Sequence, residues 1–453
     1  MGLLHPRIRR DDREAACARH RRLVRRSRGP RASGSAPSYR AGSRMLPQFG
    51  SAPEFIGNGL PGKSYLFTIT GRWRERMDAL IDRSAFIGLD QRTWFYGGAE
   101  SPPLHGMREA MNTYVANRAG GPDGRKKNSE VEQACKRNIA AMLGGRPENI
   151  ALLSNASEAI SMIASSFRFQ AGDNVVLNDL EFPSGVLPWL QLKSAGVEIR
   201  VVPSRNWQVA AEDLLASVDG NTRMVVTSHV SYMSGARIDY KKVYAELKKT
   251  KALLLVDATQ SLGVVPVTIN DADFVVSSSY KWLMAGHGAG ILAVNPERAD
   301  RFEPRNIGWR SVEDMFSDTR FEHFRFFSDA RRFEGGYPSY PTLYAMKHST
   351  DLLLSIGIDR IERHVLELGG KLIESMKRIG YEPMTPEKPE LRAGNISFVC
   401  PDGEAFADKL IEQGTYVWGG DGRLRASVHF YNNSDDVARL VGQLAAIASE
   451  RAS

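Results

Sequence analysis

Two residues with complementary chemistry stand at the ends of neighbouring apolar segments in the middle of the chain. Asp257 follows the apolar run 253–256, and Lys281, 24 residues later, follows the run 274–276 and three serines. A carboxylate can keep a pyridine nitrogen protonated, and a lysine amine can hold an aldehyde as a Schiff base. Either residue alone is better read as a stray acid or a surface lysine. Together, at two strand ends, they predict a site for pyridoxal 5′-phosphate (PLP).

A turn upstream of this pair has the composition of a phosphate site. The apolar run 150–153 leads into the small polar residues 154–157, which are expected to open a helix. Free backbone N–H groups and hydroxyl side chains at a helix N-terminus favour an anion. Alone, this turn is an ordinary helix cap. Upstream of the aspartate–lysine pair in a parallel sheet, it is the natural seat of the cofactor's phosphate.

The elements that must position these residues alternate from about residue 95. Strands are predicted at 150–153, 174–178, 198–203, 223–228, 252–257, 272–278 and 289–294, and helices near 157–168, 185–195, 211–217 and 240–250. Ser129-x-x-Glu132 has the pattern of a capping box and predicts the start of a further helix. Strands that are apolar throughout and joined by helices indicate a mostly parallel sheet covered on both faces. Ligands bind such sheets at the carboxyl ends of their strands.

The order and length of the predicted elements change after about residue 320. Helices are predicted at 341–355, 359–379 and 434–448, and strands near 395–400, 415–418 and 424–430. We therefore predict an α/β protein with a large PLP-binding domain at 96–320 and a smaller α+β domain at 321–453. The segment 45–95 is expected to pack against the small domain.

The net charge of +8 is concentrated in the first 44 residues, which hold thirteen arginines against three acids, a balance of +10. The remaining residues sum to −2, so a basic nucleic-acid-binding body is excluded. A PLP-binding regulator that uses the tail on nucleic acid is disfavoured for the same reason. The tail, 1–44, is expected to be disordered. It is either a transit peptide or the product of a start codon assigned upstream of Met45. No apolar run is long enough to span a membrane.

The cysteines and histidines form no recognisable metal or disulfide pattern. Cys17, Cys135 and Cys400 contain no CxxC pair, and no His/Cys cluster has zinc spacing. Cys135 and Cys400 are expected to be buried thiols in a reducing compartment, which favours a cytoplasmic protein. No bound metal is predicted.

Three motifs carry a resemblance to a known family. From roughly residue 90 to its end, the chain resembles the class V aminotransferases, which include cysteine desulfurases, kynureninases and isopenicillin N epimerase-like enzymes. DATQSLG at 257–263 is similar to the family's D-x-x-Q block, SSYK at 278–281 to its S-x-[HY]-K block, and NASEAI at 155–160 to its phosphate-binding turn. The resemblance implies a fold-type I homodimer that binds PLP near the subunit boundary and acts on an amino acid.

The resemblance also implies a role for each motif residue. Lys281 would be the Schiff-base lysine, Asp257 the partner of the pyridine nitrogen, and Gln260 a hydrogen-bond partner of the phenolic oxygen. The phosphate would be held by a set of small or hydroxyl-bearing residues: Ala156 through its N–H, Ser157, Ser278 and Tyr280.

Three further positions are assigned by their place in the family pattern. Phe182 stands where desulfurases stack a histidine on the cofactor ring; its alternative is a core phenylalanine. His229 stands where relatives carry a residue beside the cofactor and would be a second proton carrier; its alternative is a structural histidine. Arg425, in LRASVHFYN, would clamp the substrate carboxylate; without the family it is a charged residue on an edge strand.

Two departures from the family narrow the prediction. The loop 416–425, YVWGGDGRLR, has no cysteine where desulfurases carry their nucleophile, and Cys400 lies on an earlier strand. Tyr337 stands where relatives commonly have a threonine that reaches the partner subunit's phosphate site, so this contact is not carried over. The sequence therefore predicts a PLP-dependent aminotransferase, with a Cα epimerase or a C–S lyase as the alternative.

Overall fold

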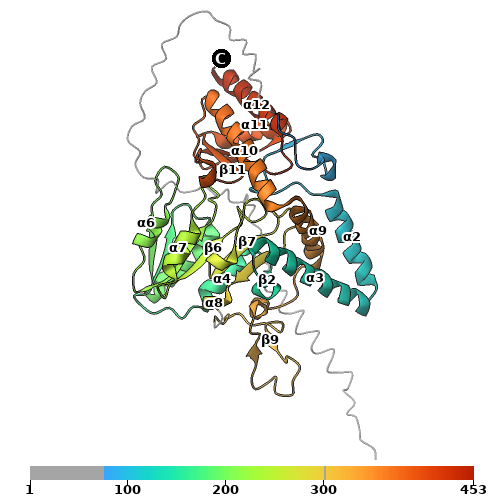
Figure 1. The fold of residues 1–453 in the computed structure, drawn as a ribbon, viewed down its shortest axis with the longest axis vertical. Helices are drawn as coiled ribbons and strands as arrows, with labels where there is room; N and C mark the ends of the chain where they lie inside the picture. Colours follow the sequence, from blue (N-terminus) through green and yellow to red (C-terminus); the bar gives the residue numbers. More distant parts are fainter. Residues whose placement is uncertain (1–75, 300–301, 453) are drawn as a thin grey trace, which may run out of the picture. The chain divides into compact units, whose positions relative to one another are not determined.

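The computed structural model describes residues 76–299 and 302–452 (Figure 1). The predicted tail, 1–44, lies outside the described residues, as does most of the segment 45–95. Within the described part of the chain, no helix is long and apolar enough to cross a membrane.

A seven-stranded sheet forms the centre of the fold. In spatial order its strands are β2 (Ile150–Leu153), β8 (Gly290–Val294), β7 (Phe274–Ser278), β6 (Leu253–Asp257), β5 (Thr222–Ser228), β3 (Asn174–Asn178) and β4 (Glu198–Val202). The five strands from β7 to β4 are parallel to one another, and β8 runs antiparallel to both of its neighbours. The prediction of a mostly parallel α/β sheet is confirmed.

The strands are apolar throughout because both faces of this sheet are buried. Val225 and Val275 belong to the core on one face, whereas Val226 and Val276, the next residue of each strand, belong to the core on the other. Successive side chains of a strand point to opposite faces, so a strand covered on both sides needs an apolar residue at every position.

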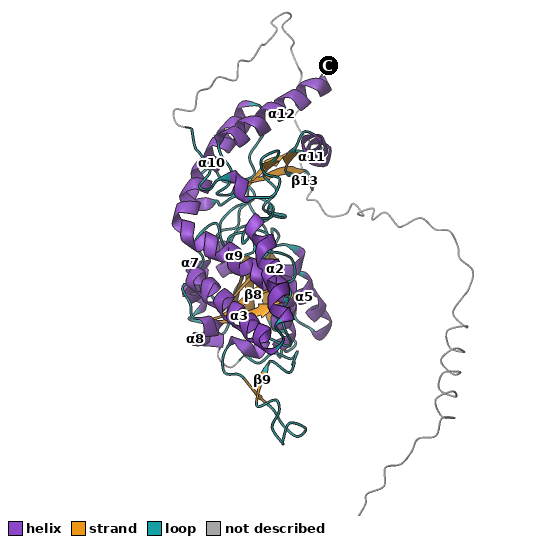
Figure 2. Cartoon of the chain, turned by 90° about the vertical axis from the view of Figure 1, so that its right-hand side faces the viewer, coloured by secondary structure: helices purple, strands orange, loops and turns teal. Residues whose placement is uncertain are grey.

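Helices pack on both faces of the sheet and beside it (Figures 1 and 2). They are α2 (His105–Ala119), α3 (Pro122–Leu143), α4 (Ala156–Ser166), α5 (Leu187–Leu190), α6 (Ala211–Ala216), α7 (Tyr240–Leu247), α8 (Pro296–Ala299) and α9 (Tyr340–Ile356). Helix α9 packs against α2 and α3. A short hairpin, β9 (Val312–Glu313) with β10 (Arg325–Phe326), precedes α9.

Two helix predictions were wrong. Helix α3 begins at Pro122, seven residues before Ser129, because a proline fits the first turn of a helix and Gly121 turns the chain into it with a φ of 59°. Glu132 of the supposed capping box instead accepts a hydrogen bond from Arg310. The single helix expected at 185–195 is two short pieces, α5 and a 3₁₀ turn at Gln191–Ala195.

A second, three-stranded antiparallel sheet lies in the C-terminal part of the chain. Its order is β11 (Asn395–Val399), β14 (Arg423–Ser427) and β13 (Trp418–Gly420), and its helices are α10 (Ile358–Arg378), α11 (Gly403–Glu412) and α12 (Ser434–Ala452). This sheet has an apolar core of its own. The strand expected at 424–430 ends at Ser427, because Asn432 accepts from the backbone N–H of His429 and turns the chain.

The described end of the predicted N-terminal segment contacts this C-terminal part. β1 (Thr93–Trp94) pairs with β12 (Thr415–Tyr416), and Arg83 forms an ion pair of 2.6 Å with Asp436. The domain boundaries themselves remain a prediction.

Candidate active site

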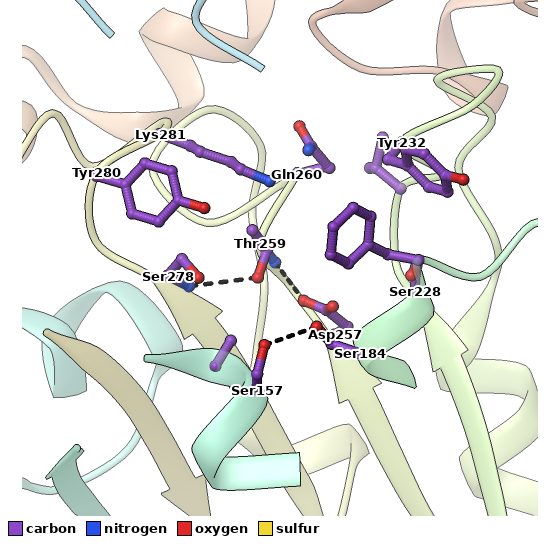
Figure 3. Close-up of a pocket in the computed structure, with 13 residues that line it drawn as sticks. Ser157, Ser184, Ser228, Tyr232, Asp257, Thr259, Gln260, Ser278, Tyr280 and Lys281 are labelled. Atoms are coloured by element: carbon purple, nitrogen blue, oxygen red, sulfur yellow. Dashed lines mark hydrogen bonds between the residues drawn. The ribbon is translucent and has the colours of Figure 1, made fainter. Parts of the chain in front are cut away.

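The carboxyl ends of β5, β6 and β7 and the start of α4 border a cavity of about 440 Å³, a volume that includes the solvent at its opening (Figure 3). Its lining is rich in hydroxyl groups and holds one lysine and one carboxylate: Ala156, Ser157, Phe182, Ser184, Ser228, Val230, Tyr232, Asp257, Thr259, Gln260, Ser278, Tyr280 and Lys281. All but one of the predicted cofactor residues and catalytic residues therefore meet at the edge of the sheet that the topology favours.

Asp257 is fixed at the end of β6, between two parallel neighbours. It pairs with Ser228 of β5 and Val276 of β7, and its Oδ1 accepts a hydrogen bond of 2.8 Å from the backbone N–H of Thr259. Burial raises the pKa of the Asp257 carboxyl, against the lowering effect of Thr259 and Lys281. The carboxylate is thus desolvated and would gain from a cationic partner.

Lys281 reaches into the cavity from the segment after β7, above Asp257 and Ser278 in Figure 3. Its side chain is largely buried, with 9% of the residue exposed, and its Nζ lies 5.4 Å from the centroid of the Phe182 ring. The backbone is held because the hydroxyl of Ser101 donates a 2.5 Å hydrogen bond to the Lys281 carbonyl. Burial, helped by the charge of Arg425 and opposed by Asp257, lowers the pKa of the amine to about 8.

The turn that was predicted to hold the phosphate opens helix α4, at Ala156. The side chain of Asn155 caps α4 by accepting a hydrogen bond from the backbone N–H of Glu158. The first residues of this helix, Ala156 and Ser157, line the cavity. The hydroxyl of Ser157 lies 2.6 Å from that of Ser184, and Ser278 donates its N–H to Thr259. β8 passes close behind the turn, where a Cβ on Gly290 would lie 2.3 Å from the backbone of Asn155.

Aromatic side chains bound the cavity on two sides. Phe182 makes an edge-to-face contact with Tyr232, with ring centroids 5.1 Å apart. Tyr280 stacks on His287 at 4.0 Å, and burial raises the pKa of its hydroxyl. These rings give the cavity the apolar walls that a planar heteroaromatic group requires.

Gln260 is held rigidly at the back of the cavity. Its amide nitrogen donates to the Gly98 carbonyl at 2.9 Å, and its oxygen accepts from Trp282 and Asn395. One amide proton remains for a ligand.

The structure does not bring His229 to the cavity. Because side chains alternate along an extended chain, Ser228 and Val230 line the cavity and His229 points to the opposite face. There its Nε2 accepts from Arg237, and its ring packs on Tyr240. Burial lowers the pKa of His229 well below its usual value. These are the surroundings of a structural histidine.

Arg425 lies on β14, next to the cavity but outside its lining. Its Nη1 donates to the backbone carbonyl of the lining residue Tyr232 at 2.8 Å. The residue is 3% exposed, and burial, helped by the charge of Arg423, lowers the pKa of its guanidinium to about 9.

The structure also places Tyr337 and the cysteines, the residues at which the sequence departs from the family pattern. Tyr337 is half exposed, its hydroxyl accepts a hydrogen bond from Nη2 of Arg125, and Arg310 lies over its ring at 5.1 Å. Cys135 and Cys400 are buried, as predicted. Cys400 lies in the core of the three-stranded sheet.

Several lining residues were missed by the sequence analysis. Thr259 and Ser184 stand inside motifs already singled out, DATQ and EFPS, and their hydroxyl groups were a usable signal. Ser228 and Tyr232 flank the histidine that was chosen instead, and period-two alternation from the end of β5 would have selected them.

The side chains of the cavity fit PLP by their chemistry. A buried amine and a buried carboxylate share one cavity with aromatic walls, and a helix N-terminus with serine hydroxyls lies at its floor. The class V aminotransferase family matches residues 104–440, which is most of the chain. The chain belongs to this family. It is a PLP-dependent enzyme.

Named relatives within the family carry different activities. An uncharacterized aminotransferase of Schizosaccharomyces pombe is 26% identical over 82% of this chain and 95% of its own length. A probable cysteine desulfurase of Methanothermobacter thermautotrophicus is 28% identical over 77% and 91%. The isopenicillin N epimerase of Streptomyces clavuligerus is 26% identical over 70% and 84%.

Solved structures agree on the fold. The apo cysteine desulfurase of Thermococcus onnurineus superposes with a TM-score of 0.75 at 24% identity, over 81% of this chain and 97% of that one. The predicted fold-type I architecture is confirmed.

Proposed function

We propose that this protein is an aminotransferase that acts on an amino acid, with Lys281 as the residue that bonds to PLP. The observation that carries the proposal is the shared burial of Lys281 and Asp257 in one cavity, with the pKa of the lysine lowered to about 8. A lysine with this pKa is partly neutral near pH 7–8, as a nucleophile and general base requires.

Different residues of the cavity would contact different parts of the cofactor. Asp257 would keep a proton on the ring nitrogen, Gln260 would donate to the phenolic oxygen, and Phe182 would cover the ring. The phosphate would be held by Ala156 N–H, Ser157, Ser278 and Tyr280. When bound, PLP supplies an electron sink for negative charge at the substrate Cα.

The chain's own groups then carry the proton chemistry. Arg425 would hold the substrate carboxylate in a bidentate pair, which fixes the direction of the Cα–H bond. The Lys281 amine would remove the Cα proton as a general base and would then donate it as a general acid on the same side of the substrate. Asp257 would stay ionised beside the ring nitrogen throughout.

Transamination is ranked first because it needs one proton carrier. Epimerisation needs a second acid on the opposite side of Cα, and His229, the residue expected there, lies outside the cavity lining. Desulfuration needs a nucleophilic cysteine, and the loop 416–425 has none. A Cα epimerase or a C–S lyase remains the alternative, supported by the similarity to an epimerase and to desulfurases.

Product analysis separates these reactions. The PLP-loaded protein is incubated with a panel of L-amino acids in D2O, with and without a 2-oxo acid acceptor. A transaminase consumes acceptor and yields a 2-oxo acid in equal amount. Three outcomes would overturn the proposal in favour of the alternative: the D-enantiomer without acceptor consumption, pyruvate and sulfide from cysteine, or pyruvate and cysteine persulfide from cystine.

We also propose that the protein is a cytoplasmic homodimer. The described chain exposes Phe316, Phe321 and Phe324 around the β9–β10 hairpin, a concentration of apolar surface that a second copy could cover. Light scattering after gel filtration should give twice the mass of 50.2 kDa. A monomeric mass at micromolar concentration would contradict the dimer.

A further inference from the structure

Two buried arginines lie side by side beside the cavity, and the proposed mechanism uses only one. Arg423 and Arg425 are two residues apart on β14, so both side chains leave the same face of the strand. The Arg423 side chain is 0% exposed. The Cζ atoms of Arg423 and Arg425 lie 4.3 and 5.3 Å from the centroid of the same indole ring, that of Trp418.

The polar partners of this pair leave several donors unused. Arg425 gives Nη1 to the Tyr232 carbonyl, and its Nε is buried without a hydrogen bond. Arg423 gives Nη1 to Asp421 at 3.2 Å and to the sulfur of Met233 at 3.3 Å. Its Nε and Nη2 are buried, and neither bonds to any described residue.

The negative charge around the pair is too small for two cations. Asp421 is the one carboxylate of the described residues that forms an ion pair with either arginine, and its side chain is 63% exposed. Elsewhere the same chain neutralises a buried cation directly, as Lys136 and Glu334 do at 2.7 Å. Burying two like charges without matching counter-charges is costly. The cost is offset when an anion binds.

Tyr232 connects both arginines to the cavity. Its carbonyl accepts from Arg425, its ring centroid lies 5.3 Å from the Arg423 Cζ, and its side chain lines the cavity opposite Lys281 (Figure 3). Both guanidinium groups therefore lie behind Tyr232, on the side of the cavity that faces Lys281, and only Arg425 acts on the Lys281 amine by its charge.

We propose that Arg423 and Arg425 together recognise an amino acid with two acid groups. Arg425 takes the α-carboxylate, and Arg423 takes a carboxylate on the substrate side chain, which makes Arg423 a specificity-determining residue. The substrate class is thus the dicarboxylic amino acids of aspartate or glutamate length. The inference rests on the proposed function, because it assumes that the substrate's α-carboxylate pairs with Arg425.

Binding of unreactive ligands tests the inference without any chemistry. Calorimetry on the PLP-loaded protein compares glutarate, which has two carboxylates, with valerate, which has the same chain length and one. Loss of a charge-assisted, bidentate contact is worth roughly tenfold or more in affinity. Glutarate should therefore bind at least about tenfold more tightly than valerate. Equal affinities would overturn the inference, and this comparison needs no variant.

Two variants then assign the effect to Arg423. Arg423→Met keeps an apolar chain of similar length over Trp418 and should abolish the preference for glutarate over valerate, with valerate binding unchanged. Arg423→Lys, which keeps the charge, should retain part of it. Asp421→Asn removes a competitor for Arg423, so the preference should persist or increase. If Asp421→Asn reduces the preference as Arg423→Met does, Arg423 only holds the turn, and the inference fails.

Turnover gives the matching substrate comparison. L-Glutamate or L-aspartate should exceed L-glutamine or L-asparagine in kcat/KM, and Arg423→Met should remove that difference through KM. Failure of the proposed function is recognised separately, by the absence of a borohydride-reducible bond between Lys281 and PLP or by the absence of 2-oxo acid formation from every L-amino acid tested. A protein that forms this bond but treats glutamate and glutamine alike contradicts the substrate class alone.

Discussion

At the scale of single residues, the reactivity of Lys281 depends on two charges that act in opposite directions. Arg425 lowers the pKa of the amine and Asp257 raises it, on top of the larger lowering by burial. The net value of about 8 means that the neutral, nucleophilic form becomes abundant more than two pH units earlier than for an ordinary lysine at 10.5.

The first prediction follows from this balance. The rate at which the apoprotein captures PLP should rise with pH and reach its midpoint near pH 8. Arg425→Met removes the positive neighbour and should move the midpoint up, whereas Asp257→Asn removes the negative neighbour and should move it down. Stopped-flow absorbance measures these rates. A midpoint near 10.5, or shifts of both variants in one direction, would contradict the assignment.

Asp257→Asn should also separate binding from turnover. An amide cannot stabilise a protonated ring nitrogen by charge, so PLP content should be retained while kcat falls by roughly 10²–10³-fold. Cofactor content is read from absorbance and kcat from product formation. Near-normal turnover would mean that Asp257 is structural.

Arg425→Lys tests the proposal that Arg425 holds the substrate carboxylate in a bidentate pair. The variant keeps the charge but loses the planar fork, so kcat/KM for amino acids should fall by about tenfold or more. Amines without a carboxylate, which never used the clamp, should be affected much less. Equal losses for both kinds of substrate would indicate an arginine with a purely structural role.

At the scale of elements, the close approach of β8 to the phosphate turn makes Gly290 a sensitive position. A Cβ there would lie 2.3–2.6 Å from backbone atoms of Asn155, so Gly290→Ala should displace the turn and cost about 1–3 kcal/mol of stability. Gly442 on α12 has no atom within 4 Å of an added Cβ, and Gly442→Ala should be neutral or stabilising by up to about 1 kcal/mol.

Chemical denaturation measures both effects, and PLP titration should show weaker cofactor binding for Gly290→Ala alone. If both variants bind PLP equally well, the turn does not hold the phosphate.

The strands were predictable from sequence, and so were the residues at their ends. Seven continuous apolar runs lack the spacing of an amphipathic helix. Asp257 follows one such run directly, and Lys281 follows another after three serines and a tyrosine. The helix start predicted at Ser129 was wrong because it rested on only two residues, Ser129 and Glu132. The backbone preferences of Gly121 and Pro122 are stronger and start the helix earlier. His229 is a different case. Its place directly after β5, beside the cavity, was predictable, but side-chain alternation turns it away from the cavity, which favours the structural alternative.

Arg423 could not have been found from the sequence, either by the apolar pattern of the strands or by the family motifs. Its unusual feature is burial beside a second arginine, and burial of a charged residue depends on tertiary packing that the pattern LRAS does not encode. The contact between Arg425 and the Tyr232 carbonyl is similar, because it depends on the approach of β14 to the loop after β5.

At the scale of the whole molecule, the two sheets meet behind the cavity through a buried polar network. Asn395, at the start of β11, donates to Gln260 and accepts from Ser427, while His429 contacts the Trp282 carbonyl. The large sheet thus supplies Lys281 and Asp257, and the smaller sheet supplies Arg425, with this network setting their relative position.

Asn395→Ala should therefore affect substrate more than cofactor. It leaves Gln260 and Ser427 short of a buried partner, at a cost of about 1–3 kcal/mol in stability. Because Arg425 lies on the strand that pairs with β11, KM for amino acids should rise while PLP remains bound. A variant that loses stability with KM unchanged would show that the network does not position the clamp.

The central claim is that Lys281 holds the cofactor, and one measurement tests it directly. The protein loaded with PLP is reduced with borohydride, digested, and mapped by mass spectrometry, alongside Lys281→Ala and the exposed-site control Lys193→Ala. We expect PLP fixed on the peptide that contains Lys281 in the wild type and in Lys193→Ala, and no fixed cofactor in Lys281→Ala. Fixation on another lysine in the wild type, or a reducible bond that survives in Lys281→Ala, would contradict it.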